Sequence, residues 1–462
     1  MFSADTYRQR RQILSERLGS GIVLFLGNEE SPMNYPDNCF PFRQDSNFLY
    51  YFGIDFPGIA ALIDIDNNRC VLFGDDYSID DIVWMGPQPK MSDRAAAVGV
   101  ENVESSASLK TFIDKALQSN RQIHFTLPYH HAVKIRLAAM LDCPLGALAE
   151  KESVELIKAI VSQREIKSEE ELAEIEKAVD VSVDMHVAAM QTARPGMMEA
   201  QVAARVEEIA LAANGYISFP VIASKNGQTL HNHYHGNILK KGDLFLLDAG
   251  AELESRYCGD LSSTFPVGQG FTDRQKLIYE MSLQSHYTAI EHLREGITYK
   301  EVHFAVCRKL ADNMKSLGLL KGNVDDIVAA GAHALFLPHG LGHQMGLDVH
   351  DMENLGEVWV GYDGEPKSTQ FGLKSLRFAK ALKQGHVFTV EPGIYFIPEL
   401  IDLWRERHIH DDFIVWNEVE KWRDFGGIRN EENYTITAQG PKRLGTKVKP
   451  KTVAEVESII CK

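Results

Sequence analysis

The sequence has no long apolar segment, no excess of positive charge and no paired-cysteine spacing. No apolar run approaches the roughly 18–20 residues that a bilayer-spanning helix requires. With 48 Lys and Arg against 64 Asp and Glu, the formal net charge is −16. This charge argues against a nucleic-acid partner, because phosphate binding requires a basic surface. We therefore expect neither a membrane partner nor a nucleic-acid partner.

Cysteine is scarce and scattered. The six cysteines show no CxxC spacing, which predicts neither a disulfide scaffold nor a thiolate zinc site. The first twenty residues alternate charged and apolar positions, and they lack the apolar core of about 7–15 residues that a secretory signal contains. Together these features predict a cytoplasmic protein with reduced thiols.

The composition otherwise indicates a folded chain of several domains. It has 462 residues, of which 44% are apolar and 24% are charged, as in ordinary globular proteins. At about 100–200 residues per domain, this length predicts two to four domains. Short apolar runs bounded by Gly, Asn or Asp predict buried strands near the N-terminus: Gly21–Leu26, Ala60–Ile65 and Cys70–Phe73.

A charge-rich stretch near residue 160, SQREIKSEEELAEIEKA, indicates a domain boundary. Ser168 and Glu171 form a capping-box signature within it, which predicts the start of a helix. Beyond it, β-rich segments alternate with helical ones. We therefore expect an N-terminal α/β domain over 1–160, a second domain over 161–446, and a peripheral polar tail over 447–462.

Two aspartates are the first candidates for chemistry. Asp248 ends an apolar run in LLDAG, and Asp260 follows 12 residues later in YCGDLSSTFP. A hairpin of that length brings the two carboxylates side by side, where they repel each other unless a divalent cation is shared between them. The residues themselves leave two alternatives open, which are one protonated and one ionised Asp, or two solvated loop residues.

Histidines cluster in HGLGHQMGLDVHD, which contains His339, His343 and His350. The glycines between them suit a ligand loop better than a helix, and the spacing differs from the HExxH pattern of zinc proteases. His231 and His233 form a second small group in TLHNHYH. Most isolated histidines are structural or exposed, but a cluster of this kind is a candidate site.

Two glutamates complete the candidate set. Glu391 ends the β-rich run in VFTVEPGIY, where Pro392 holds it in an extended conformation. Glu431 lies in GGIRNEENYTIT two residues after Arg429, on the same face of a strand. Taken locally, that pair is more typical of a surface cross-strand ion pair. Four carboxylates and one imidazole suit Mn²⁺, Co²⁺ or a carboxylate-bridged Zn²⁺ pair better than a thiolate-bound metal.

In this order the motifs resemble those of the metal-dependent Xaa-Pro peptidases, the family of prolidase and aminopeptidase P with the pita-bread fold. LLDAG, GDLSSTFP, HGLGH, VEPGIY and GIRNEE match its five ligand-bearing segments, and FRQDSNFLYYFGI and the WMG at Trp84–Gly86 resemble its N-terminal domain. The resemblance implies an α/β N-terminal domain, an α+β pita-bread catalytic domain and two divalent metal ions. Mn²⁺ is expected, with Co²⁺ or Zn²⁺ as alternatives. The implied ligands are Asp248, Asp260, His343, Glu391 and Glu431, with Asp260 and Glu431 bridging.

The resemblance also implies roles around the metals. Glu391 would take the proton of the attacking water and pass it to the leaving imino nitrogen. His350 would stabilise the oxyanion, and His231 would contact substrate near the scissile bond. His339, which lines the proline pocket, and Arg429 would serve substrate binding. The implied reaction is hydrolysis of the Xaa-Pro bond in a small peptide with proline at the second position, by a homodimer or larger homo-oligomer.

Within the family the chain resembles prolidase, the Xaa-Pro dipeptidase, more than aminopeptidase P. GLKSLRFAKALKQGH, before VEPGIY, resembles a prolidase insertion. Arg377 within it matches the arginine that holds the free carboxylate of a dipeptide. Aminopeptidase P, which releases the N-terminal residue of longer peptides, is the alternative. A solvated helix is the alternative environment for Arg377.

Some positions depart from the family pattern. Asp248 and Asp260 are one residue further apart than usual, which implies a bulge or a longer turn between them. Phe219 replaces a common Tyr, and Asn430 stands where an apolar residue is usual. A non-catalytic pita-bread binding protein is the remaining alternative. Such relatives usually lose the ligands, so the complete set favours an enzyme.

Overall fold

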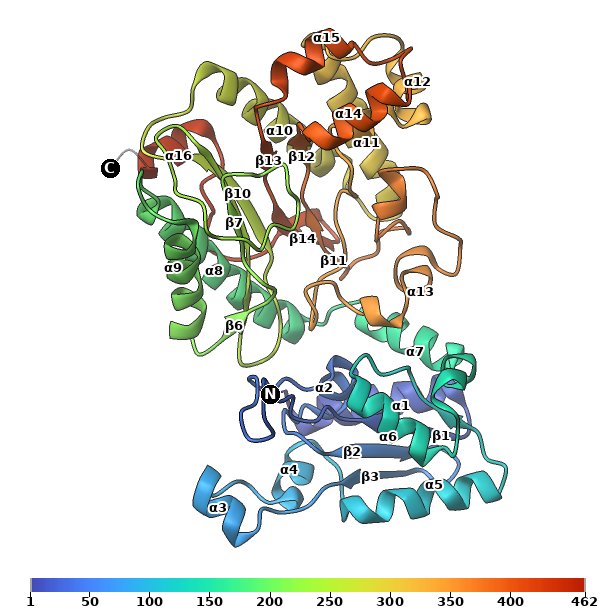
Figure 1. The fold of residues 1–462 in the computed structure, drawn as a ribbon. Coiled ribbons are helices and arrows are strands. Elements are labelled where there is room, and N and C mark those ends of the chain that lie inside the picture. Colours follow the sequence, from blue (N-terminus) through green and yellow to red (C-terminus); the bar gives the residue numbers. More distant parts are fainter. Residues whose placement is uncertain (1, 461–462) are drawn as a thin grey trace. The chain divides into compact units, whose positions relative to one another are not determined.

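The computed structural model describes residues 2–460, and the chain divides into two compact units (Figure 1). The N-terminal unit extends to Arg164 and also includes Asn354–Trp359, whereas the C-terminal unit comprises Glu165–Glu353 and the chain from Val360 onward. None of the helices in the described residues combines the length and the apolar character needed to cross a membrane. Residues 461 and 462, at the end of the predicted tail, lie outside the described part.

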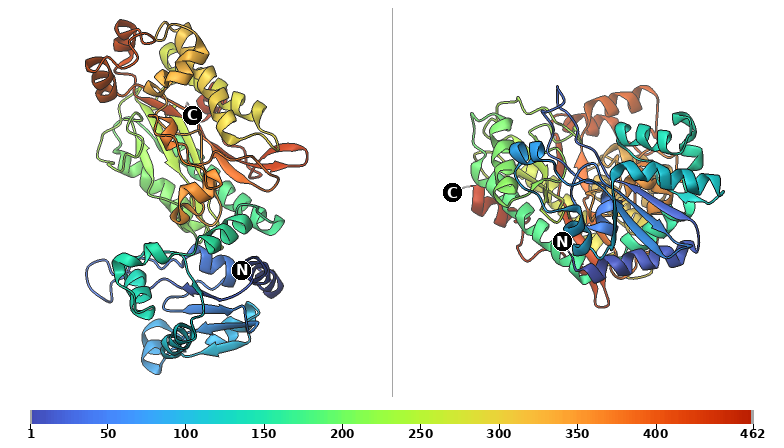
Figure 2. Two further views of the ribbon diagram at one scale, coloured as in Figure 1. Left: turned by 90° about the vertical axis from the view of Figure 1, so that its right-hand side faces the viewer. Right: turned by 90° about the horizontal axis from the view of Figure 1, so that it is seen from below.

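The N-terminal unit is built on one mixed sheet with the strand order β4-β3-β2-β1-β5. β2 pairs antiparallel with β1 and β3, while β5 and β4 add in parallel at the two edges. Figure 2 shows its strands side by side in two further views. The elements are α1 (Ala4–Leu18), β1 (Ile22–Leu26), α2 (Ser46–Phe52), β2 (Ala60–Asp64), β3 (Arg69–Phe73), α3 (Ile79–Met85), α4 (Met91–Ala97), β4 (Asn102–Glu104), α5 (Leu109–Gln118), β5 (Ile123–His124), α6 (His131–Met140) and α7 (Val154–Arg164).

The three strands predicted near the N-terminus are β1, β2 and β3. Each predicted end lies within one residue of the observed end, so this prediction is confirmed. The apolar runs become strands because they are short, rich in branched residues and bounded by turn formers. Leu24, Leu62 and Phe73 from these strands pack with Ile113 of α5 and Leu137 of α6 in one core. The unit therefore has an α/β core of its own.

The C-terminal unit combines long helices with several small antiparallel sheets. Its helices are α8 (Glu169–Thr192), α9 (Glu199–Ala212), α10 (Asp273–His292), α11 (Tyr299–Ser316), α12 (Val324–Ala330), α14 (Pro398–Glu406), α15 (Trp416–Val419) and α16 (Val453–Ile460), with α13 (Glu357–Tyr362) shared between the units. Its strands are β6 (Tyr216–Ile217), β7 (Ile222–Ser224), β8 (Leu244–Ala249), β9 (Ala251–Glu252), β10 (Leu261–Pro266), β11 (Val387–Val390), β12 (Gly393–Tyr395), β13 (Gly427–Arg429), β14 (Glu432–Thr437) and β15 (Gly440–Arg443).

The strands of this unit form the orders β10-β8-β7, β11-β14-β15, β12-β13 and β6-β9. The predicted β-rich segment over residues 386–395 is two strands, β11 and β12, which belong to different sheets. Glu391 and Pro392 separate them. Proline lacks the N–H that would continue a ladder, so the chain leaves one sheet at this point and enters another.

The prediction of a peripheral C-terminal tail is wrong. Lys449 is buried, and its Nζ donates to the Ser262 carbonyl at 2.8 Å. Val456 and Ile460 of α16 belong to the core of the C-terminal unit. Two contacts therefore hold the tail against the C-terminal unit: the apolar face of α16 packs into the core, and the Lys449 side chain bonds to β10.

The start of α8 provides a test of local folding. The Ser168 side chain accepts from the Glu171 N–H at 3.3 Å, and the Glu171 carboxylate accepts from the Ser168 N–H at 3.0 Å, as the capping-box pattern predicts. Ser168→Ala should lower the free energy of unfolding by about 1 kcal/mol, measured by urea denaturation. Ser168→Asp, which keeps an acceptor, should stay close to wild type. Equal losses in both variants would contradict the capping role.

Candidate metal centre and substrate cavity

The aspartates reach the site through the pairing of β8 and β10. These strands run antiparallel with Asp248 opposite Ser262, and Asp260 lies two residues before Ser262, so it shares that face of the sheet. The antiparallel pairing predicted from the spacing is confirmed, but the connection is more than a tight turn, because it contains β9, which pairs with β6. The two carboxylates consequently lie at one end of the same ladder.

The glutamates come from the other two sheets. Glu391 follows β11, and Glu431 lies between β13 and β14. The Ser262 hydroxyl donates to Glu431 Oε2 at 2.8 Å, and the Thr389 hydroxyl donates to Glu391 Oε1 at 3.2 Å. A hydroxyl of β10 therefore orients Glu431, and Glu391 is oriented by a hydroxyl of β11, the strand that precedes it.

His343 lies in a glycine-containing loop that runs against β11. A side chain at Gly342 would place a Cβ 2.2 Å from the Thr389 carbonyl oxygen, so only glycine permits this approach. The His343 N–H donates to the Thr389 hydroxyl at 3.1 Å, and His343 Nδ1 contacts the Gln344 carbonyl at 3.0 Å. A ring whose Nδ1–H donates to a carbonyl presents an unprotonated Nε2.

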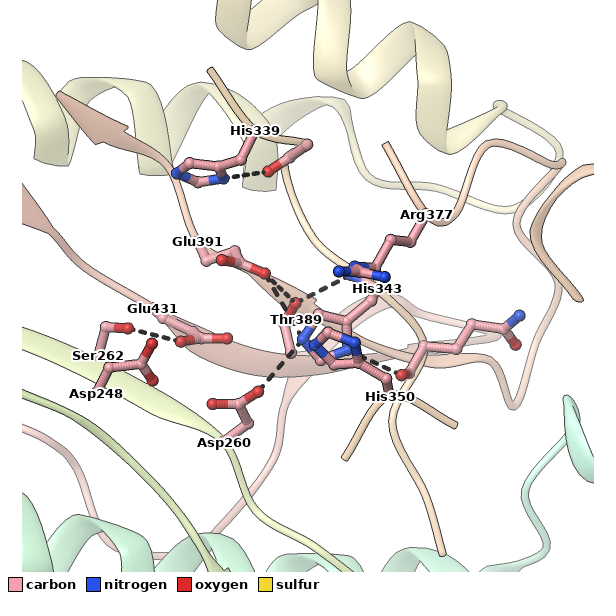
Figure 3. A network of polar contacts seen from close by, with 12 residues as sticks. Asp248, Asp260, Ser262, His339, His343, His350, Arg377, Thr389, Glu391 and Glu431 are labelled. Carbon is pink, nitrogen blue, oxygen red and sulfur yellow. Dashed lines mark hydrogen bonds and ion pairs between the residues drawn. The ribbon is translucent and has the colours of Figure 1, made fainter. Parts of the chain in front are cut away.

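These side chains converge, as Figure 3 shows. His343 Nε2 lies 3.3 Å from Asp260 Oδ2 and 3.6 Å from Glu391 Oε1. Ligand atoms of Asp260, His343 and Glu431 all lie within 4.8 Å of one another. Asp248, Asp260, His343, Glu391 and Glu431, the five predicted ligands, line the same cavity.

Burial and mutual repulsion set the electrostatics of this cluster. Burial raises the pKa of Glu391 to about 7, with the nearby Asp260 and Asp248 adding to the shift. The pKa values of Asp260 and Glu431 are also raised, first by burial and then by the neighbouring carboxylates. Without a cation, the protein therefore favours protons on these groups.

Arg429 provides the fixed positive charge next to the cluster. Its Nη2 donates to Asp248 Oδ2 at 2.6 Å, its Nε to the Ser262 hydroxyl at 3.0 Å and its Nη1 to the Tyr395 hydroxyl at 2.9 Å. Arg429 and Glu431 are 3% and 2% exposed, so the expectation of a surface cross-strand pair is wrong. The strand lies inside the unit, and Arg429 pairs with Asp248 instead.

Two unpartnered oxygen atoms indicate that these carboxylates and His343 would accommodate metal ions. Asp248 Oδ1 and Asp260 Oδ1 are buried and accept no hydrogen bond in the described structure. A buried carboxylate oxygen without a partner is costly. Divalent cations with carboxylate and imidazole ligands would satisfy both atoms and offset the repulsion among the carboxylates.

A second group of charged side chains borders the cluster. The His350 ring packs on the His343 ring with a centroid distance of 3.9 Å, and His350 Nδ1 donates to Glu353. Glu353 also forms an ion pair with Arg377. Burial alone would raise the pKa of Glu353, but His350 and Arg377 lower it to about 2.

The cavity is about 520 Å³ in volume. His231, His339, His350, Arg377 and Arg429, the other predicted site residues, all line it. Arg377 follows a short 3₁₀-helix, Leu373–Ser375, and is not part of a helix itself. Apolar wall residues include Phe219, Leu230 and Val349. Every predicted site residue is thus brought to one cavity.

Four residues that the sequence did not indicate also shape the site. Tyr395 joins His339 to Arg429, because its hydroxyl lies 2.9 Å from His339 Nε2 and 2.9 Å from Arg429 Nη1. Ser262 and Thr389 orient the glutamates, and Glu353 links His350 to Arg377. Tyr395 and Ser262 act through contacts between distant segments, for which the local sequence carries no signal, whereas Thr389 and Glu353 contact Glu391 and His350 two and three residues away.

Comparison with known proteins identifies the family. The model of metallopeptidase family M24 matches residues 173–438, more than half of the chain, and the model of the aminopeptidase P N-terminal domain matches residues 7–124. The chain belongs to metallopeptidase family M24. Membership implies divalent metal ions, in agreement with the unpartnered carboxylate oxygens.

Relatives of this M24 metallopeptidase carry two kinds of name. The human Xaa-Pro dipeptidase is 30% identical over 97% of this chain and 92% of its own length. A probable Xaa-Pro aminopeptidase of Aspergillus clavatus is 31% identical over 95% of this chain and 92% of its own length.

Solved structures show the same architecture. An Escherichia coli aminopeptidase P variant in complex with substrate has a TM-score of 0.81 at 27% identity, covering 100% of this chain and 98% of that one. Pseudomonas aeruginosa aminopeptidase has a TM-score of 0.81 at 26% identity, with both chains covered completely or nearly so. The predicted fold, an α/β N-terminal domain followed by an α+β pita-bread catalytic domain, is confirmed.

The raised pKa of Glu391 gives a test that uses no substrate. A carboxyl with a raised folded-state pKa binds its proton preferentially in the folded protein, so its contribution to stability is present below its unfolded pKa and is lost as the pH rises towards 7. In metal-free protein, Glu391→Gln should therefore gain stability relative to wild type from about pH 5 to pH 8, measured by thermal unfolding. Exposed Glu291→Gln is the control. A difference that is independent of pH would contradict the shift.

Proposed function

We propose that this M24 metallopeptidase is a dinuclear exopeptidase that hydrolyses the Xaa-Pro bond of dipeptides. The observation that carries the proposal is the convergence of four carboxylates, three of them buried, and of His343 in a cavity that Arg377 also lines. The relatives support the bond specificity, because their names include both Xaa-Pro dipeptidase and Xaa-Pro aminopeptidase.

The charge of the cluster supports two ions rather than one. Four ionised carboxylates and the guanidinium of Arg429 leave three negative units in a buried space. One divalent ion would leave a negative unit, which would disfavour an oxyanion in the transition state. Two divalent ions leave one positive unit, which a developing oxyanion would neutralise.

We assign five residues that would hold the two ions as ligands. Mn²⁺ is the proposed metal, because carboxylate oxygens outnumber the single imidazole, and Co²⁺ or Zn²⁺ are alternatives. The ligands are Asp248, Asp260, His343, Glu391 and Glu431.

The catalytic steps follow from the residues around the cluster. Two divalent ions held by these ligands would supply a water of lowered pKa and would polarise the scissile carbonyl. Glu391, oriented by the Thr389 hydroxyl, accepts the proton of that water and delivers it to the leaving imino nitrogen. His350 donates to the oxyanion. Burial lowers the pKa of His350, and the carboxylate of Glu353, which accepts from its Nδ1, opposes that shift and orients the ring.

The substrate side of the cavity is assigned to the remaining residues. His231 is an exposed loop residue that lines the cavity, and we assign it to contact near the scissile bond. His339 borders the proline pocket. Burial lowers the pKa of His339 to about 3, so the ring is neutral against an apolar imino ring. Arg429 holds His339 in place through Tyr395.

Arg377 is the residue that favours a dipeptide over a longer peptide. A dipeptidase must recognise a carboxylate directly after the proline, whereas an aminopeptidase must leave that direction open. A guanidinium is suited to bidentate recognition of a carboxylate, and Arg377 is about one-third exposed within the cavity. Glu353 beside it fixes its position without filling the cavity.

We further propose a homodimeric or larger assembly, which the family resemblance implies, and a cytoplasmic location. No disulfide joins the five cysteines of the described residues, and reduced thiols are typical of the cytoplasm. The net charge of −16 favours a small peptide substrate over nucleic acid or an anionic membrane surface.

The ligand assignment predicts the effect of a single atom change. Asp260→Asn should lower the metal content and reduce turnover by at least about 100-fold, because even residues that only support ligands are worth about 10–100-fold. Metal content is measured by mass spectrometry after dialysis, and turnover with Gly-Pro. Exposed Asp312→Asn on α11 is the matched control. Full metal content and activity in Asp260→Asn would exclude Asp260 as a ligand.

The dipeptidase assignment predicts a loss that depends on the substrate. Arg377→Ala should lower kcat/KM for Gly-Pro by at least about tenfold, because it leaves the carboxylate of the bound substrate without its partner and a charge pair of this kind is worth about 2–5 kcal/mol when desolvated. Tripeptides of the form Xaa-Pro-Xaa should be affected less. Arg377→Lys should restore little, because a point charge does not replace the planar fork. Lys374→Ala, outside the cavity lining, is the control.

A preference of the wild-type enzyme for tripeptides would overturn this assignment. Unchanged Gly-Pro hydrolysis by Arg377→Ala would overturn it as well. Either result would favour an Xaa-Pro aminopeptidase with the same metal centre.

A further inference from the structure

A second group of metal-binding side chains lies in the C-terminal unit and shares no residue with the carboxylate site. His303 and Cys307 are four residues apart on α11, so they lie on one face of that helix. His333 lies in the 3₁₀-helix Ala332–Leu335, which follows α12 (Figure 1). All three side chains are buried.

The distances in this group are those of a ligand shell. One ligand atom from each residue lies within 4.8 Å of the other two, and Cys307 Sγ is 3.4 Å from His303 Nε2. Two nitrogen or sulfur atoms bound to one ion at about 2.0–2.3 Å lie roughly 3–4.5 Å apart. Small side-chain rotations, which move these atoms by a few tenths of an ångström, would bring all three within bonding distance of one ion.

Hydrogen bonding alone does not account for the group. A thiol carries one hydrogen and can satisfy one imidazole only, and Cys307 already contacts His303. His333 Nδ1 is buried and has no hydrogen-bond partner, while the ring is held by the backbone of Ile327. An imidazole anchored to the backbone through one nitrogen, with the other nitrogen unsatisfied, is the typical arrangement of a metal ligand.

We propose that His303, Cys307 and His333 form a mononuclear site for a thiophilic metal ion, with one thiolate sulfur and two imidazole nitrogens as ligands. This site is separate from the dinuclear centre and does not depend on the peptidase assignment. On binding, the Cys307 thiol releases its proton to solvent and the sulfur bonds to the metal, so no oxidation or reduction takes place.

Charge balance favours Cu(I) over Zn(II) as the occupant. Imidazole binds a metal ion as a neutral ligand, and cysteine binds it as a thiolate. With one thiolate, the ligand set carries a single negative charge. Cu(I) gives a neutral complex, whereas Zn(II) leaves a positive charge in a buried place, which is costly. Thiolate and imidazole ligands suit both metals.

An ion at this site would join α11 to the segment that leads into the substrate cavity. His333 precedes Pro338 and His339, which line the cavity, by a few residues. The Phe336 carbonyl between them accepts from the Tyr395 N–H at 2.9 Å. The metal would therefore brace the residues that hold His339 against Tyr395.

The test uses the thiolate as its reporter, because none of the five assigned ligands of the dinuclear centre is a cysteine. The full chain is produced in copper-supplemented medium, and its copper content and near-ultraviolet sulfur-to-metal absorption are measured. Wild type should hold one more copper per chain than Cys307→Ser and should show the absorption that this variant lacks. Cys143→Ser, a buried cysteine of the N-terminal unit, should match wild type.

His333→Gln keeps the thiol and serves as a second variant if Cys307→Ser fails to fold. It should lose the copper as well. Equal copper in wild type and both variants, without a sulfur-to-metal band, would overturn the site. Co²⁺ is the probe for a divalent occupant. A Cys307-dependent band with Co²⁺ but none with Cu(I) would overturn the charge-balance assignment to Cu(I).

Discussion

The constraint that shapes the C-terminal unit is the repulsion among four carboxylates that its fold brings together in one cavity. Asp248 and Asp260 come from one ladder, and Glu391 and Glu431 come from the junctions of two other sheets. In the absence of cations, the pKa values of Asp260, Glu391 and Glu431 are raised, and that of Glu391 reaches about 7. Without cations, such a cluster lowers the stability of the folded chain. We therefore infer that the cluster serves to bind cations.

The neighbours of the carboxylates give the cluster its shape. Ser262 donates to Glu431 and also accepts from Arg429. One hydroxyl therefore links the carboxylate of Glu431 to the guanidinium that forms an ion pair with Asp248. Hydrogen bonds continue from Arg429 to the Tyr395 hydroxyl and from there to His339. Substrate pocket and metal centre thus share a single hydrogen-bonded network, and a change in one is expected to move the other.

Local sequence patterns predict the helices and strands better than they predict which polar side chains are buried. The strands β1 to β3 and the capping box at Ser168 follow from short-range chemistry, and the five motifs, by their order, indicated residues that the fold does bring to one cavity. Burial was misjudged for Arg429 and Lys449, because whether a polar side chain is exposed depends on which distant segment covers it. Scattered cysteines likewise predicted no thiolate site, although α11 and a distant 3₁₀-helix bring Cys307 to two histidines.

The central claim is that the buried carboxylates hold two divalent ions. The most direct measurement is anomalous X-ray diffraction, at the manganese absorption edge, from crystals of the chain grown with Mn²⁺. The account predicts two anomalous peaks about 3.5–4 Å apart, each within bonding distance of Asp260 and Glu431. A single peak, or two peaks that share neither of these carboxylates, would contradict it.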